Sequence, residues 1–128
     1  MIFHAVSIQQ PWADAIIVHG KDIENRTWKC PAQFLNRTIL IHAGKRVDKE
    51  ANIYYHPELQ EVFKKGFLKG GIVGALTITS GHKFHLPSRW AGDCCFNWEL
   101  THARRVPFSP IRGHLAFSRS ITRMEVPS

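Results

Sequence analysis

The chain has 128 residues, enough for one hydrophobic core but too few for two, so we expect a single domain spanning residues 1–128. Its 44% hydrophobic and 21% charged residues are typical of a folded domain and exclude a disordered or fibrous chain. The net charge of +7 is uneven: residues 1–61 hold seven charges of each sign, and residues 62–128 hold the remaining ten basic and three acidic side chains, which favours a polyanionic partner or simply a solvated basic face.

The first elements follow from a change of hydrophobic period at Gly20. An alternating segment at 4–8 predicts a short strand, and the helical spacing of apolar residues over 11–19 predicts a helix of about ten residues. Gly20 is a typical helix end. After this glycine the period becomes two, which predicts a strand at 23–28.

The rest of the chain predicts further strands with helical segments between them. The apolar run at 37–44 predicts a mostly buried strand. The polar stretch at 45–66 carries helix signals, with Pro57 opening a second helical segment. Further strands are predicted at 70–81, 95–106 and 113–121. About five short strands with inserted helices predict an α+β domain built on a small β-barrel.

The compartment is predicted from the apolar runs and the cysteines. The longest apolar runs, such as the one at 70–78, are far shorter than a membrane span, and no secretory signal is recognisable. Two of the three cysteines, Cys94 and Cys95, are adjacent and therefore poorly placed to pair with each other. We expect free thiols, no membrane partner and a cytoplasmic location.

Lys21, Glu24 and Arg26 are the main candidates for a binding site. A helix that ends at Gly20 fixes the backbone where Lys21 begins, and a helix C-terminus favours a cation there. Glu24 and Arg26 lie two residues apart and so share one face of the next strand. Held on rigid elements, the three side chains suit an anionic or amide-bearing ligand. The alternative is that Glu24 and Arg26 form an ordinary surface ion pair.

The segment SIQQPWADAIIVHGKDIENRTW at 7–28 resembles the opening motif of the ASCH domain, a branch of the PUA-like β-barrel superfamily. It places Gln-Pro-Trp before Gly-x-Lys-x-x-Glu-x-Arg-x-Trp. The segments ILIHAGK at 39–45 and WELTHARRVPFSPIRGHLAF at 98–117 are similar to later parts of the family pattern. The resemblance implies a PUA-like barrel of five to six strands with helices packed around it and a cleft beside the first helix, lined by the Lys, Glu and Arg of the motif.

The resemblance leaves several functions open. PUA-like relatives bind RNA, some small ASCH proteins resemble amidohydrolases that deacylate 4-acetylcytidine, and nuclease activity is associated with others. We expect the cleft to recognise RNA, in preference to DNA, or a modified nucleoside. Arg26 would pair with a phosphate or a base edge, Lys21 would add a point charge, and Glu24 would accept a hydrogen bond from a base amino group.

Residues outside the motif extend the prediction of nucleic-acid binding. Trp90, in the loop at 86–93, is the candidate for base stacking. Trp98 shares a strand face with other apolar residues and is assigned to the core. The candidate phosphate-binding side chains are Lys83, Arg89, Arg104, Arg105 and Arg112.

Catalysis is the alternative to binding. An amidohydrolase would use Lys21 as nucleophile or proton shuttle and Glu24 as its base. The amidohydrolase pattern has a threonine where Glu24 stands and takes a glutamate from a later strand, whereas residues 62–92 contain no acidic side chain. A metal-independent ribonuclease would need proton-transfer groups, and His42, at the end of a predicted strand, is the candidate.

We predict neither a cofactor nor a metal. His82 and His85 lie three residues apart, but no Cys-x-x-Cys or His-Glu-x-x-His pattern accompanies them. A third possibility, an adaptor that binds another protein through its surface, is favoured by no specific feature of the sequence.

Overall fold

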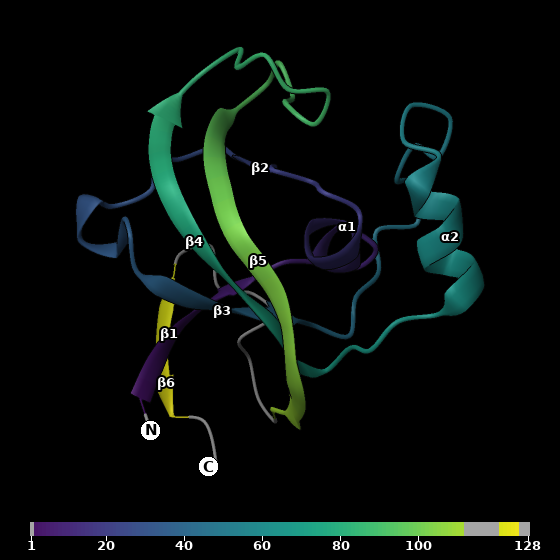
Figure 1. Ribbon diagram of the computed structural model, residues 1–128, viewed down its shortest axis with the longest axis horizontal. Helices are drawn as coiled ribbons and strands as arrows, with labels where there is room; N and C mark the ends of the chain where they lie inside the picture. The colour runs from purple at the N-terminus through teal and green to yellow at the C-terminus, as the bar shows by residue number, and fades with distance from the viewer. Residues whose placement is uncertain (1, 112–120, 126–128) are drawn as a thin grey trace.

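The computed structural model describes residues 2–111 and 121–125 of the chain (Figure 1). Its framework is a six-stranded sheet in the order β2-β5-β4-β3-β1-β6. The pair β1–β3 is parallel and the other pairs are antiparallel. The strands are β1 (Ile2–Ser7), β2 (Ile23–Arg26), β3 (Thr38–Ala43), β4 (Gly71–Lys83), β5 (Phe96–Pro110) and β6 (Thr122–Glu125).

The described residues also form two α-helices and one short 3-10 helix: α1 (Trp12–Val18), α2 (Glu58–Lys65) and η1 (Ala32–Phe34). The predicted α+β class is therefore confirmed, with a mixed sheet and two α-helices. None of these described helices has the length and apolar character needed to cross a membrane.

The sheet is open along the described part of the chain. β2 and β6 stand at the two ends of the strand order, and no pairing between described residues joins them. β4 and β5 are the longest strands and bend across the molecule (Figure 1), with several register shifts along their ladder. Bulges of this kind bend strands and increase their twist, so β4 and β5 curve. Among the described residues the sheet nevertheless does not close into the predicted barrel.

The region around the first helix follows the sequence prediction closely. α1 begins directly after Pro11 and ends before Gly20, whose positive φ of 73° suits a residue without a Cβ. The helix has seven residues rather than about ten. The change of period at the glycine therefore located both α1 and β2 correctly.

The region at 45–66 differs from the prediction because only Glu58–Lys65 is helical. In the turn before α2, the Asn52 side chain accepts a hydrogen bond from the backbone N–H of Tyr54 at 2.9 Å. Such local hydrogen bonds compete with helix formation. The strand predicted at 113–121 falls outside the described residues apart from Ile121, and β6 was not predicted.

The cysteine prediction was wrong. Cys94 and Cys95 are joined by a disulfide, with 3.8 Å between their Cα atoms. Neighbouring side chains point apart in a strand, but these residues lie in a turn just before β5, where the two sulfur atoms meet. Cys30 is a buried free thiol, and burial raises its pKa to about 11.

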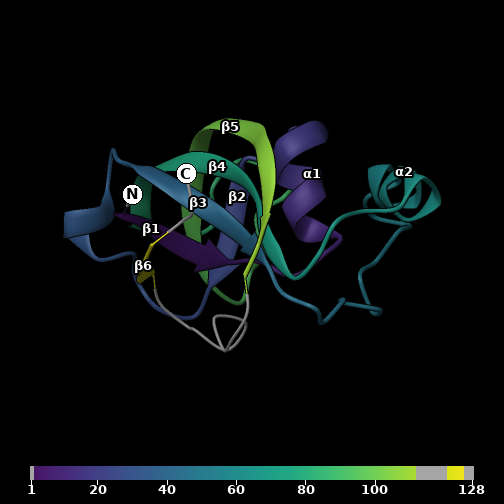
Figure 2. The ribbon, with the colours of Figure 1, turned by 90° about the horizontal axis from the view of Figure 1, so that it is seen from below.

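α1 packs against β4 and β5, and α2 lies beyond it and packs against α1 (Figure 2). A Cβ at Gly74 of β4 would lie 2.6 Å from Cδ1 of Ile17, so glycine allows α1 to approach the sheet closely. The main core joins apolar residues of β1, β3, β4 and β5 to residues of α1 and η1. A smaller apolar cluster fills the space between α1, α2 and the loop before β5, and its buried members are Ala15, Ile23, Leu59 and Trp90.

Candidate ligand-binding pocket

A pocket of about 620 Å³ opens beside β2 and the start of α1. Its lining comes from four parts of the chain: the end of β1, the segment from Trp12 to Trp28, the loop between β3 and α2, and the loop between β4 and β5. Its volume lies in the range typical of small-molecule sites. We take this pocket as the candidate site.

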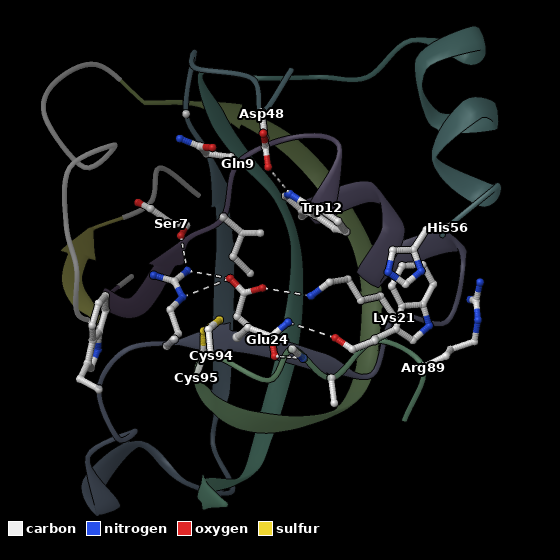
Figure 3. Close-up of a pocket in the computed structure, with 18 of the residues that line it drawn as sticks. Ser7, Gln9, Trp12, Lys21, Glu24, Asp48, His56, Arg89, Cys94 and Cys95 are labelled. Carbon is white, nitrogen blue, oxygen red and sulfur yellow. Dashed lines mark hydrogen bonds and ion pairs between the residues drawn. A yellow bond between two sulfur atoms is a disulfide. The ribbon is translucent and has the colours of Figure 1, made fainter. Parts of the chain in front are cut away.

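Glu24 holds the charged centre of the pocket together (Figure 3). Its Oε1 lies 3.1 Å from Nζ of Lys21, and its Oε2 accepts hydrogen bonds from Nε and Nη2 of Arg26 at 3.1 and 2.9 Å. Arg26 Nη2 also donates to the backbone carbonyl of Ser7 at 2.5 Å, while Lys21 Nζ donates to the carbonyl of Ile23. One carboxylate therefore holds two cations, and one of these, Arg26, links β2 to the end of β1.

The three side chains are largely shielded from water. The exposed fraction is 3% for Lys21, 12% for Glu24 and 13% for Arg26. Burial alone would raise the pKa of Glu24, but the charges of Lys21 and Arg26 and their hydrogen bonds outweigh it and lower the pKa below its ordinary value of 4.5. Glu24 is therefore a carboxylate at neutral pH.

The turn after α1 explains why Lys21 faces Glu24. The backbone N–H of Lys21 donates to the carbonyl of Ala15 at 3.1 Å, which ties the residue to the helix. The carbonyl of Asp22 then accepts from the N–H of Leu100 at 2.9 Å, so the chain enters the sheet beside β5. Two backbone contacts thus fix the direction of the segment between helix and strand.

Asn25 anchors the opposite wall of the pocket. Its Oδ1 accepts hydrogen bonds from the backbone N–H of Gly92 at 2.8 Å and from Nδ2 of Asn97 at 2.9 Å. Its Nδ2 donates to the carbonyl of Trp90 at 3.0 Å. A single side chain on β2 thereby holds the loop between β4 and β5, which brings Arg89 to the pocket.

Aromatic rings make up much of the pocket wall. Trp12, Trp28, His56 and Trp90 all line it. The His56 ring stacks on Trp90 with the ring centroids 4.2 Å apart and meets Trp12 edge-on at 6.1 Å. Lys21 Nζ lies 5.5 Å from the centroid of the Trp12 ring. The charged centre is therefore bordered by flat π surfaces.

Two buried nitrogen atoms in this wall have no hydrogen-bond partner within the described part of the chain. They are Nδ1 of His56 and Nε1 of Trp28. Burial, together with the charges of Arg89 and Lys21, lowers the pKa of His56 below its ordinary value of 6.5, although Glu58 acts in the opposite direction. A neutral imidazole with a free ring nitrogen is suited to hydrogen bonding with a ligand.

The structure brings together some of the predicted site residues and separates others. Lys21, Glu24, Arg26, Arg89 and Trp90 line the pocket. Trp90 is only 5% exposed and is stacked on His56, so it forms part of the wall and offers no open platform for a base.

Four predicted residues lie away from the pocket lining. Lys83 pairs with Glu99, Arg105 with Asp14, and Arg104 donates to the carbonyl of His102. His42 is 3% exposed, and its Nδ1 lies 3.2 Å from Oγ of Ser7. Arg112 falls outside the described residues.

Sequence reasoning missed several pocket residues. Trp12 and Trp28 flank the charged motif in the sequence, and this pattern was the available signal for an aromatic site. His56, Arg46 and Asp48 come from the irregular segment before α2 and carry no periodic signal. Contacts made by that loop, rather than by a regular element, place them in the pocket lining.

A scan against models of known protein families finds no match to the chain, and a search of curated proteins finds no relative. Within residues 2–111 and 121–125, no group of three or more His, Cys, Asp or Glu side chains is arranged to hold a metal ion.

Burial of His42 leads to a prediction about stability. Burial lowers its pKa below 6.5, so the unfolded chain binds the proton more readily than the folded chain. Its contribution to stability is therefore complete above about pH 6.5 and is lost as the pH falls through the folded-state pKa. We expect the free energy of unfolding to fall between pH 7.5 and pH 5.5, by at most about 1.4 kcal/mol per pH unit for this histidine.

Urea unfolding of the wild type and His42→Gln across this range measures the effect. His42→Gln should reduce the slope of unfolding free energy against pH, whatever its effect at pH 7.5. The matched control is His82→Gln, which replaces an exposed histidine in place of a buried one. An identical slope in the wild type and His42→Gln would contradict the prediction.

Proposed function

We propose that the pocket binds a nucleotide, either free or as part of single-stranded RNA. The observation that carries the proposal is the combination of aromatic walls with an excess of positive charge. The pocket lining includes four cationic side chains and two carboxylates. The cations are Lys21, Arg26, Arg46 and Arg89, and the carboxylates are Glu24 and Asp48.

A nucleotide combines the two chemical features that this lining complements. Its base is flat and stacks on aromatic side chains, and its phosphate is an anion that pairs with arginine. The rings of Trp12 and Trp28 and the unpartnered Nδ1 of His56 suit the base. Arg89 suits the phosphate, because its side chain is 49% exposed even though it pairs with Glu58, whereas the side chain of Arg26 is only 13% exposed and is bonded to Glu24.

The expected role of Glu24 is narrower than the sequence indicates. Both carboxylate oxygens already accept hydrogen bonds from cations, so its main role in this proposal is to hold Lys21 and Arg26 in place. We retain the ASCH and PUA-like relationship as part of the proposal, supported by the position of the Lys-Glu-Arg motif beside the first helix. A cytoplasmic location and a preference for RNA over DNA stay predictions.

A second candidate function is deacylation of an acylated cytidine. The observation in its favour is the 3.1 Å contact between Lys21 Nζ and Glu24 Oε1 inside a pocket. The same contact argues against a free amine nucleophile, since Nζ of Lys21 is already engaged by Glu24 and by the carbonyl of Ile23. β4 supplies no carboxylate to the site, because the strand contains none.

Arg89 and Arg104 provide a matched test of the binding proposal. Both are basic residues of the second half of the chain, but only Arg89 lines the pocket. We expect Arg89→Ala to weaken binding of single-stranded RNA by roughly 1.5–3 kcal/mol, and to reduce the slope of log affinity against log salt by about 0.7. Fluorescence anisotropy with a labelled oligonucleotide at several salt concentrations measures both quantities.

Arg104→Ala is the control and should leave both quantities unchanged, because this exposed side chain lies outside the pocket lining and donates a hydrogen bond to the nearby carbonyl of His102. Equal losses in the two variants would indicate binding along a general basic face. RNA binding unaffected by Arg89→Ala would contradict the proposed role of the pocket.

Incubation with 4-acetylcytidine separates binding from deacylation. We expect the wild type to leave the compound intact, because the Lys21 amine is held by Glu24 and no second carboxylate reaches it from β4. Chromatographic analysis of the products measures this. Release of cytidine by the wild type but not by Lys21→Ala, with both proteins folded, would favour the second candidate function instead.

A further inference from the structure

A second hollow of about 540 Å³ adjoins the pocket and shares part of its lining. The wall between the two includes Trp12, whose Nε1 donates to Oδ2 of Asp48 at 2.8 Å. The proposed nucleotide site is therefore one of two neighbouring hollows. The residues that line both are Trp12, Asp48, His56, Arg89 and Ala91.

Tyr55 gives the second hollow an exposed aromatic ring. Tyr55 lines this hollow and is 77% exposed. The Oδ1 of Asn52 accepts hydrogen bonds from the backbone N–H groups of Tyr54 and Tyr55 at 2.9 and 3.3 Å, which orders the turn that carries the ring. An exposed ring on an ordered turn is a typical stacking surface for an unpaired base.

Arg89 lies at the boundary of the two hollows. Its guanidinium carbon is 4.6 Å from the centroid of the Trp90 ring, and Nη1 pairs with Glu58 at 2.9 Å. These contacts position a half-exposed cation where both hollows meet. The second hollow itself is lined by the carboxylates of Asp48 and Glu50, which disfavour a phosphate there. Both oxygens of Asp48 already accept hydrogen bonds within the protein, so Glu50 is the acceptor suited to a base amino group.

We propose that the second hollow is a second base-binding subsite, and that the preferred ligand is a two-nucleotide step of single-stranded RNA. One base occupies the pocket, the next base stacks on Tyr55, and the phosphate that joins them pairs with Arg89. Consecutive bases of a strand are connected through one phosphate, so a cation between two hollows matches this ligand. The inference rests on the proposed function, because it requires a nucleotide in the pocket.

The test compares mononucleotides with dinucleotides on three proteins. The probes are the 3′- and 5′-monophosphates of adenosine and cytidine and the dinucleotides ApA and CpC, with affinities measured by isothermal titration calorimetry. The proteins are the wild type, Tyr55→Ala and the control Tyr54→Ala. Tyr54 is also strongly exposed, at 90%, but lines neither hollow. Thermal unfolding establishes that all three are folded.

We expect the wild type to bind a dinucleotide about 5- to 150-fold more tightly than the better mononucleotide, which is the range expected for stacking one more base. Tyr55→Ala should remove this advantage and leave mononucleotide affinity unchanged. Tyr54→Ala should match the wild type with every probe.

Each remaining outcome contradicts the inference in a recognisable way. Mononucleotide binding with no gain for the dinucleotides would overturn the second subsite and leave the proposed function standing. Equal losses for both ligand types in Tyr55→Ala, or the same loss in Tyr54→Ala, would also overturn it. Absence of binding to every probe would overturn the proposed function and the subsite together.

Discussion

The ion pairs of Glu24 with Lys21 and Arg26 are the interaction on which the rest of the site depends. Two cations that are nearly excluded from water need a compensating anion close by, because an unpaired buried charge is strongly destabilising. Glu24 supplies it to both. Arg26 extends the network to the carbonyl of Ser7, so the same carboxylate fixes the spacing between β2 and the end of β1. The charged side chains of the pocket are therefore held by contacts within the protein itself.

Local sequence patterns predicted the part of the site whose residues lie close together in the sequence. The change of hydrophobic period at Gly20 located α1, β2 and the three charged residues: Lys21 lies between the two elements, and Glu24 and Arg26 lie within β2. The opposite wall depends on Asn25, which holds residues more than sixty positions away in the chain through hydrogen bonds to Trp90 and Gly92. No period or spacing reveals such a contact, so the stacking of Trp90 on His56 could not be predicted.

Net charge was a weaker guide than the pattern of the opening motif. The basic excess of the second half suggested a continuous surface for phosphates, yet Lys83 and Arg105 have acidic partners and lie outside the pocket lining. A charge count cannot distinguish a paired cation from an available one. It also cannot show location, since Arg89 has an acidic partner like Lys83 and Arg105 but lines both hollows.

The proposed nucleotide site is the pocket that Trp12 and Trp28 line. The chain has four tryptophans, and their indole N–H signals can be followed separately by NMR during titration with a nucleoside monophosphate. Trp12 and Trp28 line the pocket, whereas Trp98 is 1% exposed and lies in the core. We predict saturable shifts for Trp12 and Trp28 that exceed any shift of Trp98. Signals from Trp12 and Trp28 that stay fixed at millimolar nucleotide would contradict it.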